Sequence, residues 1–129
     1  MKGLTFGAVT ALVLAALALV AVPTATAKDG DIRRVGTCTK SSTSKIKLSE
    51  ENGRIEVEFE VDQNRNGVRW NVRLTQNGRQ VARMTRVTRG PSGSFEARIV
   101  APNRAGADRF VGRATSPSGE VCTARATFS

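Results

Sequence analysis

The sequence predicts an all-β protein: an immunoglobulin-like sandwich of about seven or eight antiparallel strands that follows an N-terminal signal helix. From residue 28 onward, apolar and polar residues alternate with a period of two, which is typical of strands with one buried face. Turn sequences rich in Asn, Gly and Pro interrupt this alternation about every 8–12 residues, and no helical periodicity follows residue 27. A small β-barrel built from the same strands is the alternative fold.

The N-terminus has the pattern of a secretory signal peptide. Lys2 precedes an apolar run from about Leu4 to Val22, and the small-x-small motif Ala25-Thr26-Ala27 follows. We therefore expect residues 1–27 to be removed and residues 28–129 to form one secreted or cell-wall-associated domain. A retained membrane anchor is the alternative, because the apolar run nearly reaches spanning length. No later segment is apolar enough to suggest a membrane span after cleavage.

Cys38 and Cys122 are the two cysteines of the chain. In an exported protein such a pair predicts a disulfide, here one that ties the start of the domain to its end. Metal binding or thiol catalysis by so distant a pair is the weaker alternative. The order Cys38, Trp70, Cys122 is like that of immunoglobulin domains, but the spacing from Cys38 to Trp70 departs from theirs.

Asn52-Gly53 predicts the first hairpin of the domain. Closing the chain on this turn places Leu48 opposite Val57 and Lys47 opposite Glu58, so apolar residues meet on one face and opposite charges on the other. A one-residue slip would remove both matches. We therefore expect the acids of this strand to form a solvated charge ladder rather than a catalytic or metal cluster: Glu56, Glu58 and Glu60.

Two more hairpins are expected to follow. One closes around residues 62–67 and pairs the strand before this turn with the strand after it. This register places Phe59 opposite Trp70, Glu60 opposite Arg69 and Glu56 opposite Arg73. The other closes on Asn77-Gly78 and places Leu74 opposite Val81. This last register leaves Arg83 on the apolar face, which either a bulge near Ala82 or a rim position with a buried stem would explain.

The second half of the domain predicts strands at residues 94–101, 108–116 and 120–128. The sequence PSG between the last two suits a short hairpin turn. That turn would pair Gly112 with Ala124 and Ala114 with Cys122. Cys38, in the first strand, would then reach Cys122.

The stretch VDQNRNGVRW begins like a calcium loop, because Asp62, Asn64 and Asn66 alternate before a glycine. The twelfth position, which an EF-hand fills with an acid, is Arg73, so the stretch is not an EF-hand. A weak calcium turn formed by Asp62, Asn64 and Asn66 is one interpretation. The favoured one is a plain corner without a metal, because Asn, Asp and Gly tolerate left-handed backbone conformations.

The composition argues against enzymatic activity and against a cofactor. The chain has 0 His and 0 Tyr, which excludes Ser-His-Asp and Cys-His arrangements and His-ligated zinc. Glu96, Asp108 and Glu120 are the acids after residue 62, and we expect Asp108 and Glu120 to lie on a plain surface. No glycine-rich phosphate loop is present.

The formal net charge is +9, and the excess of arginine lies in the second half of the chain. On the expected registers the outward arginines Arg86, Arg98, Arg113 and Arg125 form a patch that could bind anionic cell-envelope or extracellular polymers. A surface that only serves solubility is the alternative. Trp70 is expected in the core, so no stacking platform for sequence-specific nucleic-acid recognition is expected. We expect a monomer.

A second function comes from a different class. The loop at residues 88–95 contains Arg89 followed by Pro91, and it could offer an arginine to a trypsin-like secreted protease. No disulfide is expected near this loop to hold it rigid, which weakens the hypothesis.

The run GTCTKSSTSKIKLSEENGRIEVEFEVDQNRNGVRWNV, together with PSGSFE, NRAGAD and SPSGEVC, resembles a group of small secreted proteins from actinobacteria. The likeness covers nearly all of residues 28–129. It implies a signal peptide, a single β domain and one disulfide. It carries over no activity and no functional residue, since the shared motifs are turns and strand edges.

Overall fold

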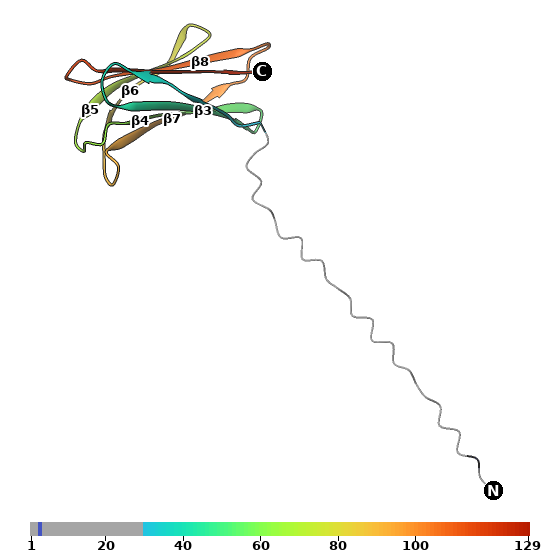
Figure 1. The fold of residues 1–129 in the computed structure, drawn as a ribbon. Helices are drawn as coiled ribbons and strands as arrows, with labels where there is room; N and C mark the ends of the chain where they lie inside the picture. The colour runs from blue at the N-terminus through green and yellow to red at the C-terminus, as the bar shows by residue number, and fades with distance from the viewer. Residues whose placement is uncertain (1–2, 4–29) are drawn as a thin grey trace.

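The computed structural model describes Gly3 and residues 30–129, and the latter form two antiparallel β-sheets that pack together (Figure 1). The predicted all-β sandwich is confirmed. The predicted signal peptide at residues 1–27 lies, apart from Gly3, outside the described residues. In the described part of the chain no helix is long and apolar enough to cross a membrane.

The strands of this part of the chain are β1 (Ile32–Val35), β2 (Thr37–Cys38), β3 (Thr43–Glu51), β4 (Arg54–Asp62), β5 (Arg69–Gln76), β6 (Arg79–Val87), β7 (Ser94–Pro102), β8 (Asp108–Thr115) and β9 (Val121–Phe128). Sheet A has the order β1-β3-β4-β7, and sheet B has the order β2-β9-β8-β5-β6. Each sheet ends in edge strands, so the alternative of a closed barrel is wrong.

The chain changes sheets between β1 and β2, at Gly36. The Gly36 N–H donates to the Ser44 carbonyl over 2.8 Å. A Cβ atom at this position would collide with the Thr123 backbone and the Ser44 side chain, so only glycine fits where the first strand passes from sheet A to sheet B.

Two hairpins have the register that the sequence predicts, because a tight turn sets the register of each. Across Asn52-Gly53, Leu48 pairs with Val57 and Lys47 pairs with Glu58. Across the 116–120 turn, Ala114 pairs with Cys122. The predicted disulfide is confirmed: Cys38 lies directly opposite Cys122 and is bonded to it. It joins neighbouring strands of sheet B, whereas the disulfide of an immunoglobulin domain spans the two sheets.

The predicted hairpin around residues 62–67 is wrong. β4 pairs with β7, so Phe59 lies opposite Ala97 and Glu58 opposite Arg98, while the segment after Asp62 crosses to sheet B. Phe59 and Trp70 are both fully buried, but they enter the core from different sheets. Alternation shows which residues face the core; it does not show whether two strands are neighbours in one sheet or face each other across the core.

Of the two explanations that the sequence leaves open for Arg83, the structure shows the bulge, which lies between β5 and β6. The pairing runs from Gln76–Arg79 to Thr75–Gln80 and then shifts, so that Leu74 pairs with Ala82. Leu74 therefore does not pair with Val81, which is the extra residue of the bulge. The shift turns Arg83 away from the core and places it opposite Arg73.

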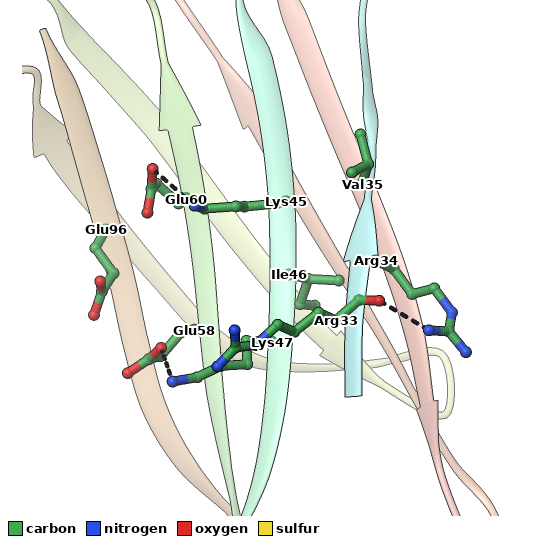
Figure 2. A pocket seen from close by; sticks show the side chains of 9 residues that line it. All are labelled: Arg33, Arg34, Val35, Lys45, Ile46, Lys47, Glu58, Glu60 and Glu96. Atoms are coloured by element: carbon green, nitrogen blue, oxygen red, sulfur yellow. Dashed lines mark hydrogen bonds and ion pairs between the residues drawn. The ribbon is translucent and has the colours of Figure 1, made fainter. Parts of the chain in front are cut away.

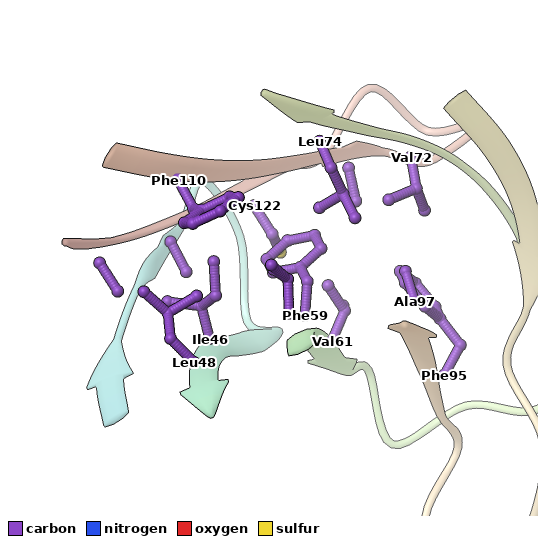
Figure 3. Close-up of a cluster of buried hydrophobic side chains, with 14 of the residues drawn as sticks. Ile46, Leu48, Phe59, Val61, Val72, Leu74, Phe95, Ala97, Phe110 and Cys122 are labelled. Atoms are coloured by element: carbon purple, nitrogen blue, oxygen red, sulfur yellow. The ribbon is translucent and has the colours of Figure 1, made fainter. Parts of the chain in front are cut away.

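The core fills the space between the sheets (Figure 3). Phe59 of sheet A lies at its centre and packs against Gly112 of sheet B, where a Cβ atom would be only 2.5 Å from the ring. The Trp70 and Phe95 rings pack with centroids 5.9 Å apart. The Trp70 Nε1–H donates to Gln63 Oε1 over 3.1 Å, so the polar atom of the buried indole is satisfied.

Candidate functional site

The outer surface of sheet B carries a group of exposed arginines. In β5 the buried residues Trp70, Val72 and Leu74 alternate with exposed residues, and β8 and β9 alternate in the same way. The period of two therefore directs arginines from four adjacent strands to the same side. We call this surface the arginine face; its arginines are Arg69, Arg73, Arg83, Arg109, Arg113 and Arg125.

Three of these arginines form a row across neighbouring strands. Arg113 of β8 lies opposite Arg73 of β5, and Arg73 lies opposite Arg83 of β6. Neighbouring strands are about 4.8 Å apart, so the three side chains start from closely spaced positions. They line one shallow cavity of about 320 Å³, which Asn71, Gln80 and Thr115 also border.

No acid neutralises this row within residues 30–129. The guanidinium groups of Arg73, Arg83 and Arg113 form no ion pair and no hydrogen bond with the described residues. Like charges directly opposite each other destabilise a sheet. The stability of the fold therefore does not account for this row.

The outer surface of sheet A is different, because its charges pair with each other. Lys47 Nζ lies 2.9 Å from Glu58, and Lys45 Nζ lies 3.6 Å from Glu60 (Figure 2). Arg98 binds Glu56 over 2.6 Å and also lies 3.5 Å from Glu51. The prediction that Glu56, Glu58 and Glu60 form a charge ladder is confirmed, but the partner from the far side is Arg98, not Arg69 or Arg73.

These contacts shift the pKa values of the ladder. The hydrogen bond from Arg98, with hydrogen bonds to Glu51 and Glu58, holds the pKa of Glu56 well below its usual range. The hydrogen bond to Glu58 raises the pKa of Lys47. Burial raises the pKa of Glu96, and the negative charges of Glu58 and Glu60 add to this effect. Figure 2 shows Glu96 beside these acids, on the rim of a cavity of about 430 Å³.

The four arginines predicted from the sequence do not form one patch. Arg113 and Arg125 lie on the arginine face, but Arg98 lies on sheet A and is bound by acids. Arg86 pairs with Trp70 and so stands on the core side of the edge strand β6. From there its Nε donates to the Glu96 carbonyl of β7 over 3.2 Å.

Sequence analysis missed Arg73 and Arg83 for a definable reason. The wrong hairpin assigned Glu56 to Arg73 as a partner, and the position of Arg83 depended on the bulge. Only the bulge brings Arg83 beside Arg73 on the outer face, and the sequence does not distinguish it from a rim position.

Asp108 and Glu120 are buried, so the prediction that both lie on a plain surface is wrong. Glu120 accepts hydrogen bonds from Ser42 Oγ over 2.6 Å and from the Ser42 N–H over 3.0 Å. Asp108 accepts from Gln76 Nε2 over 2.9 Å and from the Arg104 N–H over 3.1 Å. Burial of a charged group requires such partners, so both acids act as anchors for the neighbouring loops.

The two buried acids do not form a catalytic pair. Asp108 begins β8 and Glu120 precedes β9, at opposite ends of one hairpin, so roughly 20–25 Å of strand separates them. The carboxyl groups of glycosidases are at most about 9.5 Å apart. Glu120 also lies near Cys38 and Cys122, but both sulfur atoms are in the disulfide and cannot bind a metal as thiolates.

The 62–67 loop is held by contacts within the protein. Asp62 Oδ1 accepts from the Asn64 N–H over 3.0 Å, and Asn64 has a positive φ of 55°. The Gly67 N–H donates to the Thr88 carbonyl over 2.7 Å, and the Asn66 amide lies against Gly90. Of the three candidate calcium ligands, Asp62 thus holds the turn through its carboxylate, and Asn66 packs against the neighbouring loop. The calcium hypothesis for Asp62, Asn64 and Asn66 stays a prediction.

The geometry of the 88–95 loop does not favour protease inhibition. The Arg89 N–H donates to the Ser94 carbonyl over 2.9 Å, and the Arg89 carbonyl accepts from the Gly93 N–H over 2.9 Å. An extended peptide that binds as an added strand uses these backbone groups to pair with its partner. In this loop they are already engaged.

In comparisons with known proteins, no protein family, no curated protein and no solved structure matches this chain. The resemblance to small secreted actinobacterial proteins therefore stays a prediction, and any function must be argued from the geometry.

Proposed function

We propose that residues 28–129 form a secreted, monomeric, non-enzymatic module that binds anionic polymers of the cell envelope or the extracellular medium through the arginine face. The observation that carries this proposal is the row Arg113–Arg73–Arg83, which lacks any acidic partner among the described residues. Arginine suits such ligands because its planar fork donates two parallel hydrogen bonds to phosphate or carboxylate oxygens.

The energetics of this face favour a charged chain over a small neutral ligand. The arginines are exposed, and the cavity between them is shallow, so little apolar surface is available for burial. Attraction between a basic surface and a polyanion comes largely from release of counterions and weakens steeply with salt. Binding by this face should therefore depend strongly on ionic strength.

The positions of the aromatic side chains argue against a ligand that is recognised by stacking of nucleic-acid bases. Within residues 30–129, Trp70, Phe59, Phe95 and Phe110 are buried, and the partly buried Phe128 packs against the core. The arginine face therefore offers no ring on which a base could stack. The disulfide is compatible with an extracellular protein. Secretion itself rests on the predicted signal peptide.

Two triple variants with the same net charge test the proposal. One replaces three arginines of the row, Arg73→Gln, Arg83→Gln and Arg113→Gln. The control replaces three exposed arginines outside the arginine face, Arg65→Gln, Arg89→Gln and Arg104→Gln. Both are applied to immobilised dextran sulfate and eluted with a salt gradient.

We expect the row variant to elute at clearly lower salt than the control, because only the row variant loses closely spaced cations. Equal shifts for the two variants would show that net charge alone causes retention. Failure of the unmodified protein to bind at low salt would contradict the proposal itself.

A further inference from the structure

We propose that Arg73, Arg83 and Arg113 form a subsite for one dianionic phosphoryl group, such as a phosphomonoester on a polysaccharide or polyol chain. This inference rests on the proposed function and narrows its ligand class. The three arginines belong to adjacent strands, share one row of the sheet and line the same cavity of about 320 Å³.

The number of arginines in the row favours an ester with three terminal oxygens over a carboxylate, and their charge favours the dianionic phosphomonoester among such esters. A carboxylate has two oxygens, and a single guanidinium fork can pair with both, so a row of three arginines fits a group with three terminal oxygens better. A phosphomonoester has three strong acceptor oxygens and a charge of about −1.5 to −2 near neutral pH. Three arginines can therefore each contact a terminal oxygen of one phosphomonoester, and the central one, Arg73, is flanked on both sides.

The surroundings of the subsite suit the rest of such a ligand. Asn71, Gln80 and Thr115 border the same cavity, and their amide and hydroxyl groups can hydrogen bond to hydroxyls of a sugar or polyol. Within residues 30–129 the arginine face carries no Asp, Glu, Lys or His side chain. The charged groups of this face are the six arginines that define it, and Glu120 and Asp108 are buried.

This composition makes the pH dependence of binding diagnostic of the ligand. The second pKa of a phosphomonoester is about 6, whereas arginine stays charged throughout the accessible range. Acidification to about pH 5 should therefore weaken binding to a phosphomonoester, because the ligand loses charge. Binding to a sulfate ester should not change in the same interval.

The test uses three soluble dextrans of matched length and substitution that carry phosphomonoester, sulfate ester or carboxymethyl groups. Binding of the protein to each is measured at constant ionic strength, at about pH 7.5 and about pH 5. We expect the phosphorylated dextran to bind best at the higher pH and to lose roughly five- to tenfold in affinity at the lower pH, with the sulfated dextran unchanged.

Charge-conserving variants separate the fork geometry from the charge. The variant Arg73→Lys, Arg83→Lys, Arg113→Lys keeps the net charge but replaces planar forks by point charges. The control is Arg69→Lys, Arg109→Lys, Arg125→Lys, on the same face but outside the row. We expect the row variant to bind all three dextrans with similar affinity, while the control keeps the preference for phosphate.

The outcomes distinguish this inference from the function on which it rests. If the unmodified protein binds the three dextrans equally at both pH values, the phosphoryl subsite is wrong and the polyanion-binding function stands. If the row variant keeps the preference for phosphate, the subsite lies elsewhere and the inference is wrong. If no dextran binds, both proposals fall.

Discussion

A single methyl group added at Gly112 should strain the contact between the two sheets. In the substitution Gly112→Ala the new Cβ would lie 2.5 Å and 2.6 Å from two ring carbons of Phe59. Both residues are buried, and protein interiors have few voids into which the ring could move. Either the Phe59 side chain or the sheets themselves must shift.

The expected cost follows from overpacking in a dense core. Insertion of a methyl group without free volume typically destabilises a protein by about 1–3 kcal/mol. For a domain of this size that corresponds to a melting temperature roughly 5–15 °C lower. Thermal unfolding followed by circular dichroism measures it, and Val111→Ala, on the outer side of the same strand, provides a control that should change little.

A second substitution shows whether Phe59 causes the effect. Phe59→Leu alone should destabilise the fold because it removes packed atoms. Combined with Gly112→Ala, it should cost less than the sum of the two single changes, because the smaller side chain leaves room for the new methyl group. Additive effects, or a Gly112→Ala variant as stable as the unmodified protein, would refute the packing of sheet A on sheet B described above.

Three other predictions concern stability and charge. Glu120→Ala should lower the urea midpoint, since it leaves the buried Ser42 N–H and the Lys40 N–H without their acceptor. Each buried donor without an acceptor costs about 1–3 kcal/mol of unfolding free energy. An unchanged midpoint would contradict this anchoring role. Removal of the disulfide by Cys38→Ser and Cys122→Ser should lower the free energy of unfolding by up to about 4–5 kcal/mol, because the bond closes a loop with a sequence separation of 84. Urea unfolding measures the loss, and an unchanged free energy of unfolding would contradict the prediction. Arg98→Gln should raise the pKa of Glu56 towards its ordinary value. Because the folded-state pKa lies below the unfolded one, this pair stabilises the protein above about pH 4.3, and the stabilisation disappears on acidification. NMR titration of the Glu56 carboxyl measures the change, and an unchanged pKa in the variant would show that Arg98 is not its partner.

Local signals made part of the fold predictable. Asn52-Gly53 fixes the register of β3 against β4 because a two-residue turn leaves no freedom of alignment, and the charges of Lys47 and Glu58 confirm it. The PSG turn does the same for β8 and β9, and this register brings Cys122 opposite Cys38. In each case the residues that decide the pairing are close together in the sequence.

Non-local pairing was not predictable in the same way. The next strand after β4 alternates as a sheet neighbour would, but residues 63–68 carry it across the core, and the true neighbour β7 comes much later in the chain. The buried positions of Asp108 and Glu120 have the same origin, because their hydrogen-bond partners Gln76 and Ser42 lie on distant segments. A sequence pattern reports which side of a strand is apolar, not which segment later covers a charge.

The candidate site was only half predictable for this reason. The outward direction of Arg113 and Arg125 follows from alternation within one hairpin. Whether Arg98 is free depends on Glu56, which reaches it only because β4 pairs with β7. The row of Arg73, Arg83 and Arg113 depends on three strands and one bulge at the same time.

The most direct test of the central claim is to map the bound polymer on the protein by NMR. Backbone amide shifts are recorded while phosphorylated dextran is added at low salt. We expect the largest shift changes in β5, β6 and β8 around Arg73, Arg83 and Arg113. The amide shifts of sheet A around the ion pair of Lys47 and Glu58 should stay unchanged. Changes centred on sheet A, or spread evenly over both sheets, would contradict binding by the arginine face.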